Sequence, residues 1–264
     1  MTSGNVNRHV PDPDAQSAQE LRHSLDIARP MALDTSIHKL QIFRSVVSLM
    51  PAGRLLDLGA GRGNFSLAAA QLGWTVTAVD ARKVRLPDPM EVDNALVADL
   101  IRDVTWIQAD VREFPLAPGD YDLICILGLL HHLEVPDQRA LLSRCASTPT
   151  LIDTRTAPAT MDEVEGYEGV IIAEHGATRE ERDLVPTAAW GNAHSFRHTE
   201  ASLLRLTQDC GYAKMMQMLP AHRRNYTFYL CMPQPEPTAK RLVARNRRVT
   251  PRRSQEKPLN AGAL

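Results

Sequence analysis

The chain reads RLLDLGAGRG from Arg54 to Gly63. The apolar start of this stretch predicts a buried strand over Arg54–Leu58, and the alternating glycines predict a tight turn into a helix over Asn64–Leu72, which Gly73 can end. Glycine suits such a turn, because a residue without Cβ lets the backbone reverse and lets a ligand lie against it. Turns of this kind mark the carboxyl edge of a parallel sheet, where nucleotide-like ligands bind.

The glycine spacing separates two classes of ligand. The dinucleotide fingerprint G-x-G-x-x-G would need glycine at position 64, where this chain has Asn64. The pattern is instead D-x-G-x-G-x-G, with Asp57 two places before the first glycine. A pyrophosphate gains from bare amides at a helix start but not from a neighbouring carboxylate, whereas a cationic amino group is attracted to one. The spacing therefore favours a ligand with a positive charge.

Acids recur at the ends of the following apolar runs. Residues 74–79 lead to Asp80, which lies on the order of 20 residues past the first glycine. Rossmann-type folds place a ribose ligand at an acid in this position. Its two carboxylate oxygens can accept both ribose hydroxyls. Residues 104–109 lead to Asp110, and residues 121–127 lead to Gly128. Asp80 or Asp110 alone would also suit a strand-end turn. Asp57, Asp80 and Asp110 together, each at or just beyond the end of a different predicted strand, indicate one site.

This order of motifs resembles the class I S-adenosylmethionine-dependent methyltransferases over about residues 36–233, most strongly from Arg54 to Leu133. The resemblance implies S-adenosyl-L-methionine as cofactor, with Asp57 at its methionine end, Asp110 at the adenine amino group and the Val111 amide at a ring nitrogen. The full set that it implies is Asp57, Leu58, Gly59, Ala60, Gly61, Gly63, Asp80, Ala81, Asp110, Val111, Leu127 and Gly128.

The predicted fold class is α/β. Apolar strands without strict alternation, separated by helix-sized segments, indicate parallel strands covered on both faces. With the family resemblance, this predicts a Rossmann-like, doubly wound, mostly parallel seven-stranded sheet closed by an antiparallel hairpin. The other predicted elements are helices over residues 37–50, 137–146 and 200–209, a strand over 150–154, and hairpin strands over 214–219 and 226–232, joined by 220–225.

Length and composition predict one domain with attached segments. The chain has 264 residues and 44% hydrophobic content, enough for one sizeable core. The expected division is a disordered N-terminus over residues 1–19, a methyltransferase domain over 20–233, and a basic disordered tail over 234–264. The net charge of −1 gives no general attraction to nucleic acid, although the tail offers a second interpretation as a phosphate-contacting segment.

Residue usage also predicts the compartment. The four cysteines stand far apart inside predicted elements, which indicates small core residues in a reducing environment. Residues 1–14 lack the apolar stretch of a signal peptide, and no apolar run approaches ~20 residues. We therefore expect a cytoplasmic protein with no membrane partner. The spacing of histidines and cysteines predicts no metal site. The oligomeric state stays open.

The segment from Arg155 to Thr199 is much longer than an ordinary connection. Its apolar and aromatic residues, which include Tyr167, Trp190 and Phe196, can fold over the site as a substrate lid or simply pack on the core.

Methyl transfer needs a base only when the acceptor starts protonated, as a hydroxyl does. His131 and His132 follow the fourth strand and are the first candidates for this base, because histidine can take a proton near neutral pH. A helix-capping or packing role is the alternative for both. Asp153, at the end of the fifth strand, and His194, in the insertion, are weaker candidates.

The sequence predicts a methyltransferase acting on an oxygen or nitrogen of a small-molecule metabolite. Two alternatives stay open. Residues 195–212 faintly resemble a stretch of the tRNA wobble-uridine carboxymethyltransferases, which would make nucleic acid the partner, although no basic carboxylate-reading site is recognisable. A catalytically silent fold that binds the cofactor as a scaffold is the other, since fold does not fix function.

Overall fold

The computed structural model describes residues 37–82, 86–176, 178–185, 189–223 and 225–235. The disordered N-terminus predicted for residues 1–19 lies outside these ranges. So does the predicted basic tail, apart from its first two residues.

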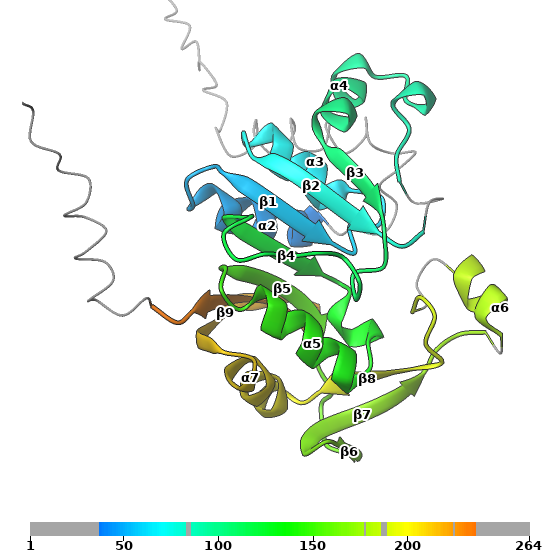
Figure 1. The fold of residues 1–264 in the computed structure, drawn as a ribbon, viewed down its shortest axis with the longest axis vertical. Coiled ribbons are helices and arrows are strands. Elements are labelled where there is room, and N and C mark those ends of the chain that lie inside the picture. The colour runs from blue at the N-terminus through cyan, green and yellow to red at the C-terminus, as the bar shows by residue number, and fades with distance from the viewer. Residues whose placement is uncertain (1–36, 83–85, 177, 186–188, 224, 236–264) are drawn as a thin grey trace, which may run out of the picture.

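A seven-stranded sheet forms the centre of the molecule, in the order β3-β2-β1-β4-β5-β10-β9 (Figure 1). Neighbours among β1 to β5 are parallel, and β10 runs antiparallel to both β5 and β9. This confirms the predicted doubly wound sheet with its closing hairpin. The strands are β1 (Arg54–Leu58), β2 (Thr75–Asp80), β3 (Thr105–Gln108), β4 (Leu123–Leu127), β5 (Thr150–Arg155), β9 (Tyr212–Arg223) and β10 (Tyr226–Pro233).

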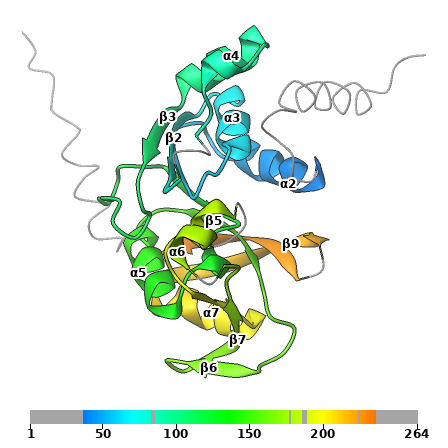
Figure 2. The same ribbon diagram turned by 90° about the vertical axis from the view of Figure 1, so that its right-hand side faces the viewer.

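Helices cover both faces of this sheet, as the near-continuous apolar strands predict. Figure 2 shows α2 and α3 on one side and α5 on the other. In β4, Cys125 and Leu127 pack with α2 and α3, whereas Ile124 and Ile126 pack with α5 and α7. The helices are α2 (Ile37–Ser48), α3 (Asn64–Gln71), α4 (Ala95–Asp103), α5 (Val135–Cys145) and α7 (Glu200–Asp209), with 3₁₀ turns η2 (Pro89–Glu91) and η3 (Leu130–His132).

Element boundaries differ from prediction mainly in the closing hairpin. The predicted connection over residues 220–225 is wrong, because β9 continues to Arg223 and pairs there with Tyr226. Pro220 does not end the strand, since β9 is the edge of the sheet and an edge strand has one row of backbone groups without ladder partners. All four cysteines are buried and free, as predicted.

The long insertion folds as a second, antiparallel sheet in the order β6-β7-β8, with one short helix. Its elements are β6 (Asp162–Val164), β7 (Tyr167–Ala173), α6 (Arg179–Leu184) and β8 (His194–His198). The Phe196 amide donates to the Leu133 carbonyl at 3.0 Å, and the Tyr167 hydroxyl donates to Asp209 at 2.8 Å. The insertion is thus fastened to the segment after β4 and to α7.

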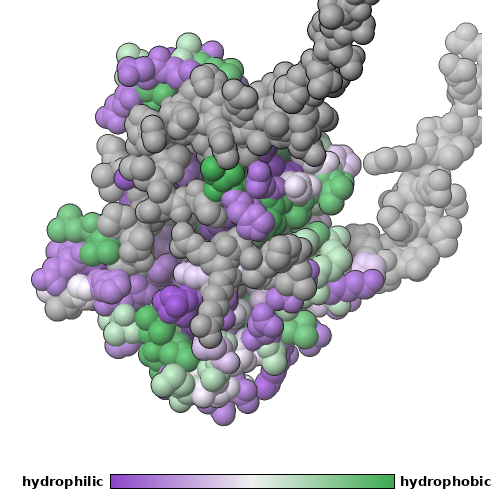
Figure 3. All heavy atoms as spheres, turned by 180° about the vertical axis from the view of Figure 1, so that it is seen from behind, coloured by the Kyte–Doolittle hydropathy of each residue, from purple (hydrophilic) through white to green (hydrophobic). Residues whose placement is uncertain are grey.

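On the face seen in Figure 3, the hydrophobic atoms that the structure describes lie in separate patches between polar ones. Within the described ranges, every helix is too short or too polar to cross a lipid bilayer.

A buried polar network joins the insertion to α5. The Gln138 amide donates to the carbonyls of Leu133 and Phe196, both at 2.9 Å, so its oxygen is free to accept from His198 Nε2 at 2.9 Å. His198 Nδ1 then accepts from the Ser202 hydroxyl at 2.9 Å. These bonds fit the neutral ring, and burial lowers the pKa of His198 to about 4.

We expect the network to make stability depend on pH. A histidine whose pKa is lowered by folding stabilises the protein above its unfolded pKa and loses that contribution as pH falls. The free energy of unfolding should therefore drop by on the order of 3 kcal/mol between about pH 6.5 and pH 4 on account of His198. Urea titrations at several pH values would measure this.

His198→Gln should flatten that drop. His194→Gln, which changes an exposed histidine on the same strand, is the control and should keep the parent's dependence. If the free energy of unfolding fell equally with pH in the parent and in His198→Gln, His198 would not be the group responsible.

Candidate functional site

The glycine turn after β1 has one closely packed end and one open side. Gly59, Gly61 and Gly63 all have positive φ, at 77°, 58° and 78°. A Cβ on Gly63 would collide with the Trp106 ring, whereas a Cβ on Gly61 would meet nothing within 4 Å. Gly63 is therefore required by packing. Gly61 borders open space, as a residue lying against a ligand would.

Two acids flank the turn. Asp57 is buried and accepts from the Ser66 hydroxyl at 2.6 Å. Burial, opposed in part by this hydrogen bond, raises the pKa of Asp57 to about 6. Asp80, at the end of β2, accepts from the amides of Gly61 and Arg82, both at 2.9 Å. The sequence-predicted acids of β1 and β2 thus meet at the same turn.

The third predicted acid is bound to an arginine. Both oxygens of Asp110 accept from the Arg112 guanidinium, at 2.5 to 3.0 Å. Burial alone would raise the pKa of Asp110, but its hydrogen bonds with Arg112 outweigh burial and lower that pKa. Arg112 also donates to the Trp190 carbonyl at 3.2 Å, and the Trp190 ring lies 5.3 Å from the Arg82 guanidinium. The insertion therefore reaches the residues that follow β2 and β3.

The remaining predicted cofactor positions line the same edge. Leu58 and Leu127 end β1 and β4 and are both buried. Gly128 follows with φ of 83°, and a Cβ there would stand 3.7 Å from Lys39 Nζ. Ala60 is the second residue after β1, Ala81 directly follows β2, and Val111 is buried next to Asp110 in the chain.

An ion pair crosses this edge from α2 to β5. Lys39 Nζ lies 2.6 Å from Asp153 Oδ2, and the carboxylate is completely buried. Lys39 also lies 5.1 Å from the Phe65 ring centroid, and its charge acts on Asp57. Asp153 is thus committed to a cation, which argues against the weaker expectation that it serves as a base.

The two histidines after β4 have different surroundings. His131 is buried, and its Nδ1 accepts from the Arg155 amide at 3.3 Å, which leaves the ring proton on Nε2. Burial, and next the neighbouring His132, hold the pKa of His131 well below its usual range. The basic nitrogen of His131 is therefore directed at the backbone, as in a packing residue.

His132 is half-buried and is oriented by an acid from the insertion. Its Nδ1 lies 3.2 Å from Glu174 Oε1. Burial would raise the pKa of Glu174, but interactions that include the hydrogen bonds from His132 and the Ala189 amide outweigh it and lower that pKa to about 2. A carboxylate can only accept, so His132 Nδ1 carries the proton and Nε2 keeps its lone pair. This is the geometry of an oriented general base.

No described contact joins the His194 side chain to His132 or Glu174. Its ring is exposed on β8, and its carbonyl accepts from the Asn192 amide.

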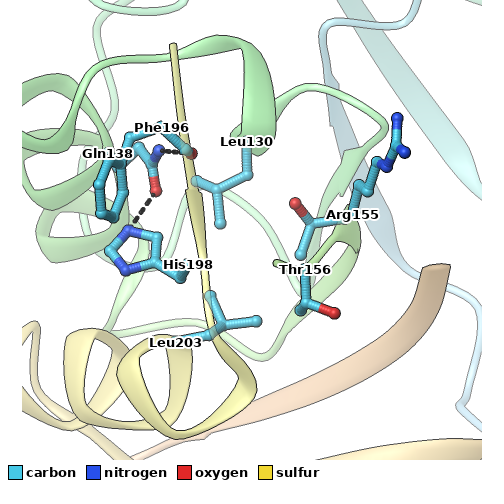
Figure 4. A pocket seen from close by; sticks show the side chains of 8 residues that line it. Leu130, Gln138, Arg155, Thr156, Phe196, His198 and Leu203 are labelled. Atoms are coloured by element: carbon cyan, nitrogen blue, oxygen red, sulfur yellow. Dashed lines mark hydrogen bonds between the residues drawn. The ribbon is translucent and has the colours of Figure 1, made fainter. Parts of the chain in front are cut away.

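A small pocket has Leu130 of η3 in its lining. Figure 4 shows His198 and Gln138 hydrogen-bonded on one side of this pocket, while the Arg155 side chain extends away from it. With Leu130, Phe196 and Leu203 in its walls, this pocket belongs to the packing of β8.

Several residues at this edge of the sheet were not predicted from the sequence. Lys39 could have been recognised, since it stands four places before the buried Phe43 and so places a charge on the apolar side of α2. Glu174 could not, because its position depends on how the insertion folds back. The same holds for Arg155 and Arg197 at the ends of β5 and β8.

Residues 55–148 match the family model described as a methyltransferase domain. Among curated proteins, the ubiquinone biosynthesis O-methyltransferase of Xanthomonas campestris is 30% identical over 142 residues, which cover 51% of this chain and 49% of the relative. An uncharacterized protein of Mycobacterium bovis is 27% identical over 156 residues, 57% of this chain and 53% of that protein. The chain thus spans about half the length of the curated relatives it matches.

Solved structures share the fold. The N-terminal domain of EvdMO1, crystallised with S-adenosylhomocysteine, superposes with a TM-score of 0.58 at 18% identity and covers 85% of this chain and 97% of that one. The 1,6-didemethyltoxoflavin-N1-methyltransferase of Burkholderia thailandensis gives 0.50 at 16% identity, covering 86% and 91%. These structures show that the chain shares their fold, and the family match shows that residues 55–148 resemble a methyltransferase domain.

Proposed function

We propose that this protein transfers a methyl group from S-adenosyl-L-methionine to an oxygen or nitrogen of a small molecule. The observation that carries the proposal is the meeting of two sets of residues at one edge of the sheet. The open glycine turn with Asp57 and Asp80 suits a cationic nucleoside ligand. The oriented pair of His132 and Glu174 stands after the adjacent strand β4.

The residues present fit the cofactor. Gly61 offers bare backbone beside open space, and the Asp80 carboxylate beside it is of the type that accepts from ribose hydroxyls. Asp57 suits the amino group of the methionine end, and Lys39 its carboxylate. Asp110 would keep its bond to Arg112 while accepting from adenine. When bound, S-adenosylmethionine supplies a methyl group on a positively charged sulfur.

The chain's own contribution is to orient the acceptor and to move its proton. His132 Nε2 would accept the proton of an acceptor hydroxyl, and Glu174 would stabilise the imidazolium that results. Holding the reacting groups in line is worth up to ~7–11 kcal/mol in favourable cases. We propose that the insertion acts as the lid that excludes water, since it supplies Glu174 and covers Arg82 and Arg112 through Trp190.

The direct test is a search for product. The purified protein would be incubated with trideuteromethyl-labelled S-adenosylmethionine and a small-molecule extract, and mass spectrometry would find compounds that gain one labelled methyl. RNA and protein fractions would be treated in parallel. Label confined to RNA would overturn the small-molecule acceptor, and failure to bind S-adenosylhomocysteine would overturn the methyltransferase proposal as a whole.

Gly61→Val should weaken S-adenosylhomocysteine binding while leaving the fold intact, because the new side chain enters open space at the turn. The positive φ of 58° adds strain of roughly 1–2 kcal/mol. Gly119→Val is the matched control, since Gly119 also has positive φ and open surroundings but precedes β4, at the opposite edge. Calorimetric titration would measure affinity. Undiminished affinity in Gly61→Val would count against this site.

Cofactor binding should release protons near pH 6. With its pKa at about 6, roughly half of Asp57 is protonated in the free protein at that pH, and a cationic amino group beside it favours the ionised form. Calorimetry of S-adenosylhomocysteine binding in two buffers of different ionisation enthalpy would detect the released protons. Asp57→Asn should abolish this release and Asp99→Asn, on the exposed side of α4, should not. Buffer-independent heats at pH 6 would contradict the role of Asp57.

If the acceptor is a hydroxyl, His132→Ala should lower the single-turnover rate by ~10²–10⁴ at unchanged cofactor affinity. Glu174→Gln should lower the rate less than His132→Ala does, because a neutral amide no longer stabilises the imidazolium. His131→Ala is the comparison and should chiefly lower stability. Near-parent rates in His132→Ala would rule out this base.

A further inference from the structure

Two guanidinium groups lie close enough to His131, the neighbour of the proposed base, for their charges to act on it. Arg155 is the last residue of β5, and Arg197 lies on β8 in the insertion. The charges of both act on His131, whose ring centroid is 4.5 Å from that of His132. The Tyr226 ring lies 5.6 Å from His131 and 5.6 Å from the Arg155 guanidinium carbon. The arginines, the tyrosine and the histidines therefore form one cluster at the carboxyl end of β4 and β5.

Among the residues that the structure describes, these two side chains form no ion pair with an acid, and Glu174 acts on Arg197 only through its charge. Within the residues that the structure describes, neither guanidinium forms an ion pair with a carboxylate or a hydrogen bond to another side chain. The Nε atom of Arg197 is buried, and its N–H donates to no group that the structure describes. Leaving a charged donor buried and unsatisfied is costly, so this N–H needs a partner, which an anionic ligand would supply.

The nearby carboxylates are already committed. Asp153 is paired with Lys39 at 2.6 Å, and Glu174 with His132 and the Ala189 amide. Burial, and next the charge of Arg155, lower the pKa of Arg197, so the two cations act unfavourably on each other. The cationic sulfur of a bound S-adenosylmethionine would add to the positive charge of these two arginines. An anion bound between the arginines would reduce their mutual repulsion.

The shape of the guanidinium group narrows the class of anion. Its planar fork matches the two oxygens of a carboxylate or a phosphate and binds either through paired hydrogen bonds. On the basis of the proposed function, we propose that the methyl acceptor carries an anionic oxygen group, a carboxylate or a phosphate, that Arg155 and Arg197 bind beside His132.

The carboxylate of the cofactor is the competing occupant, and its place on the sheet argues against it. The glycine turn follows β1, whereas Arg155 ends β5, which is two strands further along. Neighbouring strands are ~4.8 Å apart, so the two positions are separated by about 10 Å. Lys39, which acts on Asp57, is the nearer cation for the methionine end.

The test needs no knowledge of the acceptor. The S-adenosylhomocysteine complex would be screened by thermal shift against aromatic and aliphatic carboxylates and phosphate monoesters, each paired with its neutral amide or alcohol. We expect stabilisation by anionic members alone, and the two anion classes identify which group the site prefers. Calorimetry should then show roughly tenfold or greater loss of affinity for the best anion in Arg155→Gln and in Arg197→Gln.

Controls separate the possible causes of a loss. Arg102→Gln changes an exposed arginine on α4 that pairs with Asp99, and it should bind the anion like the parent. Arg155→Lys keeps the charge but not the fork and should lose less than Arg155→Gln. If Arg197→Gln fails to fold, Arg197→Lys replaces it. Affinity for S-adenosylhomocysteine should stay unchanged in all of these variants.

Equal binding of neutral partners, absence of any anion binding, or anion affinity unchanged in both glutamine variants would overturn the inference. Loss of S-adenosylhomocysteine affinity in those variants would assign the arginines to the cofactor instead. A parent protein that does not bind S-adenosylhomocysteine would defeat the proposed function, and the same panel on the free protein would still test the anion site.

Discussion

The hydrogen bond from the Gly61 amide to the Asp80 carboxylate, at 2.9 Å, fixes the arrangement on which the site depends. It ties the turn after β1 to the end of β2, in a turn where three glycines have positive φ. Asp57 lies beneath this turn, shielded from water, with a raised pKa. The turn therefore presents two acids and open backbone on the same side of the sheet, as a ligand with a cationic end requires.

The acceptor side is built by the neighbouring strands and completed by the insertion. η3 supplies His132, and the insertion supplies Glu174 and Arg197. The network of Gln138 and His198 fastens β8 to α5, so a side chain on β8 is held at a fixed place relative to β4. The strand that anchors the insertion therefore also carries Arg197 of the proposed anion site.

The sequence predicted the sheet because each of its signals is local. Glycines at alternating positions and acids after apolar runs mark β1 to β3, and the helix-sized segments between them indicate parallel strands covered on both faces. The acceptor side depends on long-range contacts instead. Glu174 lies 42 residues from His132, and no pattern in either segment links them. His131 and His132 are adjacent in sequence, and only their surroundings show which one keeps a free lone pair.

The measurement that tests the central claim most directly is a crystal structure of the protein with S-adenosylhomocysteine. The account predicts density for the amino group beside Asp57, for the ribose hydroxyls on Asp80, and for the sulfur on the side of His132, with the bond between His132 and Glu174 retained. A nucleoside bound elsewhere would contradict it. A sulfur that faces away from His132, toward the packed interior of the protein, would also contradict it.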